Sequence, residues 1–416
     1  MARRNESTAT GQTWDRLWSV WGMGLAWLLL FPATSTAQYA FEQSATKVER
    51  YDQVEVKLVR KDALDVNPFT DAKLTGELAL PGKPSRSIQV EGFASSADGR
   101  EFRIRFMPTQ AGAHRYTLHL AVGEKFLTFA GQFDAVEGKR SGIIRVDADH
   151  PYHFLDEGTG KHWFWNSTTT YQILAWDDAT MEVALRRLAG LGVNRIRVAV
   201  CGRTRDGKRW NEPLVVPTEQ FKFRMEPWLA ANPDNLEQPG FDTSRFNLSY
   251  YEKIDRFMRL ARELNMVVSI IFYVDGRDAG VDPFGKELCG QSAEQMYYRY
   301  TIARLAAYPN LMWDVTNEWH LFRTEPWVEQ MGAFIKECDP YDHLVSVHGH
   351  GQFPFRRSAW ADFAMFQSWD EHGGYEFMLR NRQEQLGLGR PIPQVNEEYG
   401  YEDHDVDWVR TPAAFL

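Results

Sequence analysis

The sequence predicts an α/β protein in which an all-β sandwich precedes a (β/α)8 barrel. Short alternating strands separated by turn signals occupy the chain up to residue 138, whereas strand-like and helix-like segments alternate after it. Polar residues also gather at the ends of the later strands. A chain of 416 residues is long enough for two or three domains. We therefore expect a sandwich at 38–138 and a barrel at 139–416.

The N-terminal segment has the pattern of a targeting sequence. Arginines 3, 4 and 16 precede an apolar run from Val20 to Phe31, and small residues then lead to Ala37. The run of about 12 residues is too short to cross a bilayer as a helix. We expect a signal peptide at 1–37 that is cleaved after Ala37, with a membrane anchor as the alternative. The protein would then be secreted or periplasmic, without stable membrane insertion.

Composition excludes several classes of function. Hydrophobic residues make up 44% and charged residues 25% of the chain, which is ordinary for a globular protein. A net charge of −9 without a basic block argues against nucleic-acid partners. Cys201, Cys289 and Cys338 lie far apart and form no Cys-x-x-Cys motif, so isolated thiols are expected, with one disulfide left open.

Alternating apolar residues predict the strands of the sandwich. Val54, Val56 and Leu58 alternate with polar or charged neighbours, and the same period recurs at 102–106 and 116–120. Turn dipeptides separate these runs at 81–82, 98–99, 111–112 and 122–123. Regular short strands without a helical period favour a two-sheet sandwich.

Seven strand candidates follow residue 138. They lie at 162–166, 193–200, 266–273, 311–316, 344–348, 364–368 and 392–395, and helical patterns lie at 177–191, 250–264, 292–307, 327–338 and 375–386. We expect the barrel to be incomplete in this chain, unless the tail at 408–416 supplies a poor eighth strand.

A barrel is favoured over an open nucleotide-binding sheet. The sequence contains neither GxGxxG nor GxxxxGK[ST]. Polar side chains instead recur where successive strands end: Asn166, Arg197, Asn317, Glu318, His348, Glu397 and Glu398. In a (β/α)8 barrel, the active site lies at this carboxyl edge.

Two glutamates suggest the chemistry. Asn317-Glu318 ends the fourth predicted strand, and Glu397-Glu398 ends the seventh. Paired carboxyls across a cleft can cleave a glycosidic bond, one protonating the leaving oxygen and the other attacking or activating water. Neither task needs a metal or cofactor, so we expect none. Burial beside Trp319 would help to keep one carboxyl protonated.

The motifs resemble those of the retaining (β/α)8 glycoside hydrolases of the cellulase-like clan. Asn317-Glu318 is similar to the Asn-Glu pair that ends the fourth strand in that clan. The segment from Pro393 to Gly400 is similar to its nucleophile motif and indicates Glu398. Gly192 to Arg197 is similar to its Gly-x-Asn-x-x-Arg motif, and His348 fits a histidine near the fifth strand.

A narrower resemblance is to the apiosidase-like subfamily. It is carried by the front sandwich and by the segments 142–146 and 163–166, and the whole resemblance spans about residues 45 to 405. Members often carry an N-terminal immunoglobulin-like domain. The resemblance therefore implies that fold for the sandwich and a carbohydrate substrate for the barrel.

The resemblance implies a double displacement. Glu398 would form a glycosyl-enzyme, and Glu318 would protonate the leaving group and then deprotonate water, with the carboxyls about 5–5.5 Å apart. Asn317 would bind the 2-hydroxyl of the sugar, and Arg197 would orient the nucleophile. Further substrate contacts are expected from His348, Asn166, Trp319, Trp369 and Tyr399.

Other interpretations remain open at this stage. The clan usually has a small residue directly before its nucleophile, whereas this chain has Glu397 there. Glu397 is therefore an alternative to Glu398 as the nucleophile. An inverting enzyme, or a carbohydrate-binding protein with a degenerate barrel, would share much of the pattern. His348 and His350 could bind a metal, and Trp176, Trp210 and Trp228 could stack on sugars or pack in the core. The basic segment within 202–249 suggests an acidic or decorated glycan.

Overall fold

The computed structural model describes residues 39–202, 225–235, 237–274, 276, 280–349, 351–368 and 373–398. The described residues, from Tyr39 on, belong to one compact unit. The predicted signal peptide lies outside the described residues. Within the described part of the chain, no helix is both long and apolar enough to cross a membrane.

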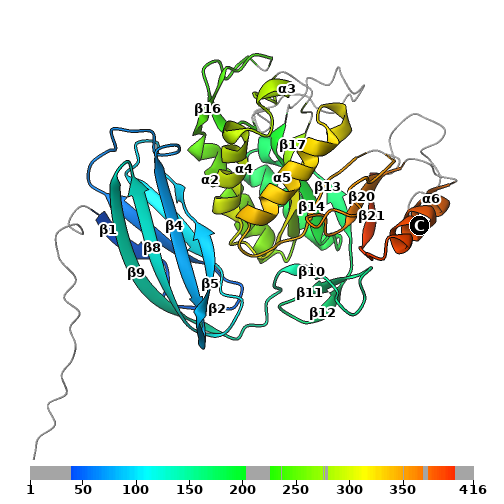
Figure 1. The fold of residues 1–416 in the computed structure, drawn as a ribbon, viewed down its shortest axis with the longest axis horizontal. Helices are drawn as coiled ribbons and strands as arrows, with labels where there is room; N and C mark the ends of the chain where they lie inside the picture. Colours follow the sequence, from blue (N-terminus) through cyan, green and yellow to red (C-terminus); the bar gives the residue numbers. More distant parts are fainter. Residues whose placement is uncertain are drawn as a thin grey trace, which may run out of the picture. The chain divides into compact units, whose positions relative to one another are not determined.

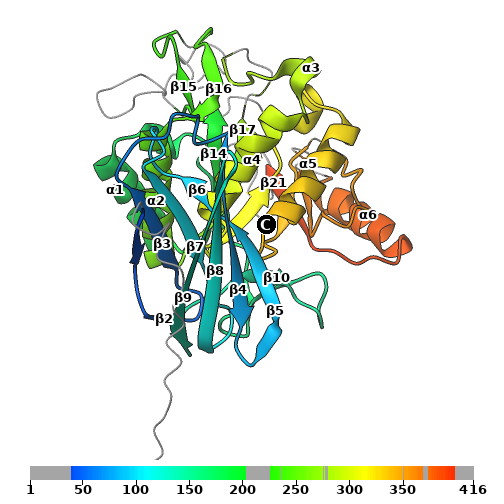
Figure 2. The ribbon, with the colours of Figure 1, turned by 60° about the vertical axis from the view of Figure 1, so that its left-hand side comes forward.

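The first region is a two-sheet β-sandwich, drawn in blue to teal in Figure 1. One sheet has the strand order β1 (Tyr39–Gln43), β3 (Val54–Arg60), β7 (Glu101–Phe106), β6 (Phe93–Ala94). The other has the order β2 (Lys47–Glu49), β9 (Lys125–Val136), β8 (Gly112–Val122), β4 (Ala72–Leu80), β5 (Lys83–Glu91). Figure 2 shows β4, β8 and β9 side by side as long ribbons. The predicted alternation is confirmed, since Val54, Val56 and Leu58 are fully buried.

A small antiparallel sheet connects the two regions. It consists of β10 (Ile144–Val146), β11 (Phe154–Asp156) and β12 (Lys161–Trp163). The prediction that 162–166 is the first barrel strand is wrong, because β12 pairs antiparallel with β11. Trp163 and Trp165 pack against Phe154 at 6.1 and 4.9 Å between ring centroids, and Trp165 also contacts Phe363. This aromatic cluster accounts for the apolar run that suggested a barrel strand.

Parallel strands alternate with helices in the second region. Five of them form one sheet in the order β13 (Ser167–Thr169), β14 (Arg195–Gly202), β17 (Val267–Val274), β18 (Leu311–Asp314), β19 (Val345–Ser346). A parallel pair follows, β20 (Ala364–Gln367) and β21 (Gln394–Glu398). The backbone N–H of Gln367 donates to the carbonyl of Gly349 at 3.2 Å and so connects β20 to the segment after β19.

Helices separate the parallel strands as the sequence predicts. They are α1 (Asp178–Gly190), α2 (Leu248–Glu263), α3 (Gly285–Leu288), α4 (Ser292–Leu305), α5 (Glu325–Cys338) and α6 (Gly374–Gly387), with short 3₁₀ helices η2 (Ile173–Ala175) and η3 (Trp319–Leu321). Asp177, Asn247 and Thr324 cap α1, α2 and α5 through their side-chain oxygens. Every residue of β14 and β17 is buried, as expected of parallel strands covered on both faces.

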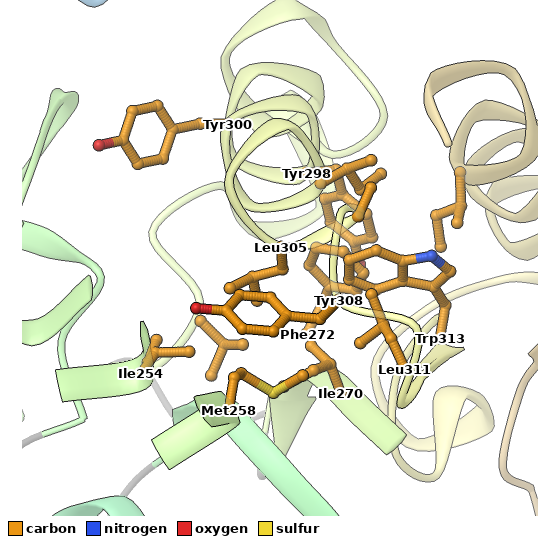
Figure 3. Packing of buried hydrophobic residues seen from close by; sticks show 14 of the residues in the cluster. Ile254, Met258, Ile270, Phe272, Tyr298, Tyr300, Leu305, Tyr308, Leu311 and Trp313 are labelled. Carbon is orange, nitrogen blue, oxygen red and sulfur yellow. The ribbon is translucent and has the colours of Figure 1, made fainter. Parts of the chain in front are cut away.

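An aromatic stack supports the strand that leads to Asn317-Glu318. The rings of Phe272 and Tyr298 lie 3.8 Å apart and nearly parallel, and Trp313 lies 5.7 Å from Phe272. Figure 3 labels these three residues among the buried side chains. The hydroxyl of Tyr298 donates to the carbonyl of Val315 at 2.9 Å. Trp313 donates its indole N–H to Asp339 at 2.9 Å. The carboxyl end of β18 is therefore held by packing from β17, α4 and α5.

A charged cluster joins the sandwich to the barrel. Arg105 on β7 contacts both carboxylate oxygens of Asp255 on α2, at 2.6 and 3.0 Å. Arg304 on α4 donates to the same carboxylate at 2.9 Å. All three side chains are buried. Nearby, the hydroxyl of Tyr341 accepts from the backbone N–H of Met107 at 2.8 Å.

An antiparallel pair follows β14, made by β15 (Trp228–Ala230) and β16 (Phe241–Phe246). Trp228 is fully buried and packs against Tyr297 at 4.7 Å, so it belongs to the core and does not stack on a sugar. The basic residues at 203–224 and Trp210 lie outside the described residues. Cys201, Cys289 and Cys338 are free thiols.

Candidate active site

Glu318 occupies a sharp turn at the end of β18. Its backbone is left-handed, with φ 44° and ψ 51°, and it immediately precedes η3. A non-glycine residue in this region carries strain of about 1 kcal/mol or more, which is a feature of functional sites. The backbone N–H of Asn317 donates to the carbonyl of Tyr273 at 3.0 Å and anchors the turn to β17. Glu318 itself is half-buried.

The side chain of Asn317 is oriented by two donors. Its Oδ1 accepts from the hydroxyl of Tyr171 at 3.1 Å and from Nη2 of Arg197 at 3.2 Å. Because both partners are donors, the atom that they contact is the amide oxygen, and this fixes the assignment of Oδ1 and Nδ2. Nδ2 consequently points toward Glu318, with 3.3 Å to its Oε2.

Arg197 forms a buried ion pair with Asp314. Its Nη2 lies 2.7 Å from Oδ2 of Asp314, and both side chains are fully buried. Burial raises the pKa of Asp314 to about 6, although Arg197 acts to lower it. Burial acts to lower the pKa of Arg197, but Tyr171 and Asp314 raise it overall. The contacts shown for Arg197 are with Asp314, Asn317 and Tyr171, and its orientation of Glu398 stays a prediction.

Glu398 ends β21 and is held from two neighbouring segments. Oε1 accepts from Nε2 of Gln367 on β20 at 2.8 Å. Oε2 lies 3.7 Å from Nε2 of His348, which follows β19 and is fully buried. The side chain of Glu398 retains 10% exposure. It is therefore constrained, yet accessible to a small approaching group.

Glu397 has a different environment from its neighbour. Both of its oxygens lie 2.9 Å from Nη1 of Arg195 on β14. The side chains of Arg195 and Glu397 are 0% and 3% exposed. The guanidinium of Arg195 also lies 4.1 Å from the centroid of the Trp165 ring. Glu397 is thus an interior ion-pair partner, and this favours Glu398 as the nucleophile.

Tyr171 is a site residue that the sequence did not reveal. It follows β13, and its hydroxyl contacts Asn317 directly. Burial is the main cause that raises its pKa well above the usual range, and the charges of Glu398 and Glu318 contribute to the rise. Its ring is therefore within electrostatic reach of both carboxylates. The available signal was its position after a strand, but that strand was misplaced in the sequence.

Asn166 is the predicted contact that the structure contradicts. It precedes β13. Its backbone carbonyl accepts hydrogen bonds from the backbone N–H groups of Asn194 and Arg195, at 2.9 and 3.3 Å. Its Nδ2 donates to the carbonyl of Gly192 at 2.8 Å. Asn166 therefore lies at the amino end of the parallel strands, opposite the candidate site. The error has the same origin as the misplaced first strand.

Trp319 follows Glu318 in the chain and begins η3. Its backbone N–H donates to the carbonyl of His348 at 3.3 Å. Its ring packs edge-on against Phe355 at 5.4 Å. A Cβ at Gly349 would come within 2.5 Å of the indole nitrogen, so glycine is required for this approach. Trp369, Tyr399 and His350 lie outside the described residues.

The described residues contain no cluster of three or more His, Cys, Asp or Glu side chains suited to hold a metal ion. His348 instead faces Glu398.

Comparison with known families places this geometry in context. The model of the family described as "Apiosidase-like, catalytic domain" matches residues 150–415. The chain belongs to this family. It is a glycosidase. A domain of unknown function, DUF5060, matches residues 47–121 within the sandwich.

A solved structure shares the fold over most of this chain. A protein from Bacteroides vulgatus that is assigned as a glycoside hydrolase is 24% identical, with a TM-score of 0.70 over 88% of this chain and 68% of that chain. A family 5 glycoside hydrolase from the same organism is 17% identical, with a TM-score of 0.45 over 63% of this chain and 54% of that chain. A family 5 mannosidase from Rhizomucor miehei is 16% identical, with a TM-score of 0.44 over 63% and 74%. No curated protein matches the chain significantly.

Proposed function

We propose that the apiosidase-like chain is a retaining glycoside hydrolase with Glu398 as nucleophile and Glu318 as acid/base. The observation that carries the proposal is the contrast between the two neighbouring carboxylates of β21, Glu397 and Glu398. Glu397 is neutralised by Arg195 in the interior, whereas Glu398 remains accessible beside Gln367 and His348.

The two glutamates have environments suited to different roles. Glu398 accepts a hydrogen bond from Gln367 and has His348 nearby, so its carboxylate is held in position for attack on the anomeric carbon. Glu318 lies beside the amide of Asn317 and the aromatic Trp319. It protonates the departing oxygen, and the resulting carboxylate then removes a proton from the water that releases the sugar. Asn317 presents Nδ2 to the 2-hydroxyl.

The wider proposal concerns substrate and location. The substrate is an oligo- or polysaccharide, and the basic segment after β14 favours an acidic or decorated glycan. The arginine-flanked apolar segment supports a secreted or periplasmic protein. The two-sheet topology supports an immunoglobulin-like fold for the sandwich.

The catalytic assignment is tested with Glu398→Gln and Glu318→Gln on a panel of aryl β-glycosides and on plant and bacterial polysaccharides. Glu398→Gln is expected to lower kcat on the order of 10⁴-fold or more, because no intermediate forms. Glu318→Gln should lower kcat/KM about 10²- to 10⁴-fold with poor leaving groups, and far less with dinitrophenolate, which needs no proton. Glu376→Gln, at an exposed position on α6, is the matched control and should retain full activity.

Two outcomes would replace this proposal. If Glu318→Gln and Glu398→Gln turned over substrate as fast as the parent, neither glutamate would be catalytic. If the parent bound glycan without turnover, the chain would be a carbohydrate-binding protein. Proton NMR of the first-formed sugar separates retention from inversion. An inverted anomer would require carboxyls about 6.5–9.5 Å apart.

A further inference from the structure

Strand β21 contains a β-bulge at Glu397, directly before the proposed nucleophile Glu398. In the pairing of β20 with β21, Phe366 lies opposite Asn396, and Gln367 lies opposite Glu398. Glu397 is therefore the extra residue of the bulge. The side chain of Asn396 exchanges two hydrogen bonds with the backbone of Ser368, at 3.2 and 3.0 Å, and anchors the strand beside the bulge.

The bulge lets two consecutive side chains serve the same interior. In a regular strand, neighbouring side chains point to opposite faces. Here Glu397 reaches Arg195 on β14, while Glu398 reaches Gln367 on β20. Arg195 is fully buried, and its Nη1 also donates to Ser167 at 2.9 Å. The ion pair thus connects the bulge to β13 and β14.

Charges surround Glu398 from every neighbouring element. Arg195 and Arg197 lie on β14, Asp314 and Glu318 lie on and after β18, His348 follows β19, and Tyr171 follows β13. Gln367 on β20 is neutral, and Tyr273 on β17 donates its hydroxyl to Glu294. Among these groups, Arg195 pairs with Glu397 and Arg197 pairs with Asp314, so two buried ion pairs of opposite charges balance each other.

We propose that Arg195 and Glu397 are a charge-balanced positioning pair: the ion pair holds the bulge that presents Glu398 and sets the charge against which Glu398 ionises. The proposal rests on the proposed function of Glu398. Neither residue touches substrate, so both act through the nucleophile. Removing either partner leaves one uncompensated charge beside Glu398, and the two removals have opposite signs.

The test is the pH profile of kcat/KM, whose acidic limb reports ionisation of the nucleophile in the free enzyme. Glu397→Gln leaves Arg195 in excess, which favours the anionic nucleophile and should move the acidic limb about one pH unit lower. Arg195→Met leaves Glu397 in excess and should move it about one unit higher. The double variant Arg195→Met/Glu397→Gln should return the limb close to that of the parent.

Controls separate positioning from stability. Arg195→Lys keeps the charge but loses the geometry, so kcat should fall while the acidic limb stays in place. Because Arg195→Met removes a buried partner, its folding is checked by circular dichroism. If Arg195→Met does not fold, the near-isosteric Glu397→Gln still tests the predicted direction in which the acidic limb moves. The proposed role of the pair would be overturned if the acidic limb of the pH profile were unchanged in folded Glu397→Gln. It would also be overturned if the limb moved in the same direction in both single variants. Turnover that survives Glu398→Gln would overturn the proposed function itself.

Discussion

At the scale of single residues, the hydrogen bonds on Asn317 decide how the site presents its donor. Tyr171 and Arg197 both donate to Oδ1, so Nδ2 faces Glu318. Without the hydroxyl of Tyr171, Arg197 alone would hold the amide. The orientation of Asn317 would then be less well determined.

Tyr171→Phe should lower kcat/KM by about 2- to 10-fold on glycosides with a 2-hydroxyl, because one hydrogen bond that orients Asn317 is lost. On the matching 2-deoxy glycosides the same variant should show little change. Measuring both substrates with parent and variant makes the comparison. An equal loss on the two substrates would mean that Tyr171 does not act through the 2-hydroxyl contact.

Sequence motifs identified the candidate glutamates but not their supporting residues. Glu318 and Glu398 lie within recognisable local patterns. Tyr171, Gln367 and Arg195 reach the site through pairing between distant strands, which no local pattern encodes. Arg195 had one usable signal, since residues two apart on a strand share a face and Arg197 was already a candidate. The bulge that separates Glu397 from Glu398 left no trace in the sequence.

At the scale of elements, long buried segments were predictable and short half-buried ones were not. The predicted helix at 250–264 and strand at 266–273 match α2 and β17 within two residues, because their apolar periods are strong. By contrast, β13 has only three half-buried residues, Ser167–Thr169, without an apolar run. A neighbouring aromatic segment was therefore taken as the strand, and the prediction for Asn166 failed with it.

The stack behind β18 should contribute strongly to stability. Phe272→Ala removes a fully buried ring between Tyr298 and Trp313 and is expected to lower the free energy of unfolding by about 3–5 kcal/mol. Urea unfolding followed by circular dichroism measures the loss. Phe126→Ala on β9, whose ring is 76% exposed, is the control and should change little. A loss below about 1 kcal/mol for Phe272→Ala would contradict the packing described.

At the scale of the whole molecule, Asp255 links the sandwich to the barrel. Burial acts to raise its pKa, but Arg105 and Arg304 outweigh burial and lower it from 3.8 to about 2. A carboxyl whose pKa is depressed on folding stabilises the protein above its unfolded pKa, and this contribution is lost as pH falls through the folded pKa. The shift corresponds to about 2 kcal/mol at neutral pH.

Asp255→Asn should therefore be less stable than the parent at pH 7, and the difference should shrink as pH falls from about 4 toward 2. Thermal unfolding of both proteins across that range gives the difference directly. The exposed Asp178→Asn, at the start of α1, serves as control. A stability difference that does not change with pH would show that the link does not depend on the charge of Asp255.

The left-handed backbone of Glu318 has a practical consequence for capturing substrate. Asparagine adopts this conformation several-fold more readily than most residues, because its short side chain can bond locally. Glu318→Asn should therefore relieve backbone strain while removing the acid/base carboxyl. Such a variant would fold at least as well as the parent and leave a bound glycan intact. The turn at Glu318, the proposed proton donor, thus also provides a route to an uncleaved complex.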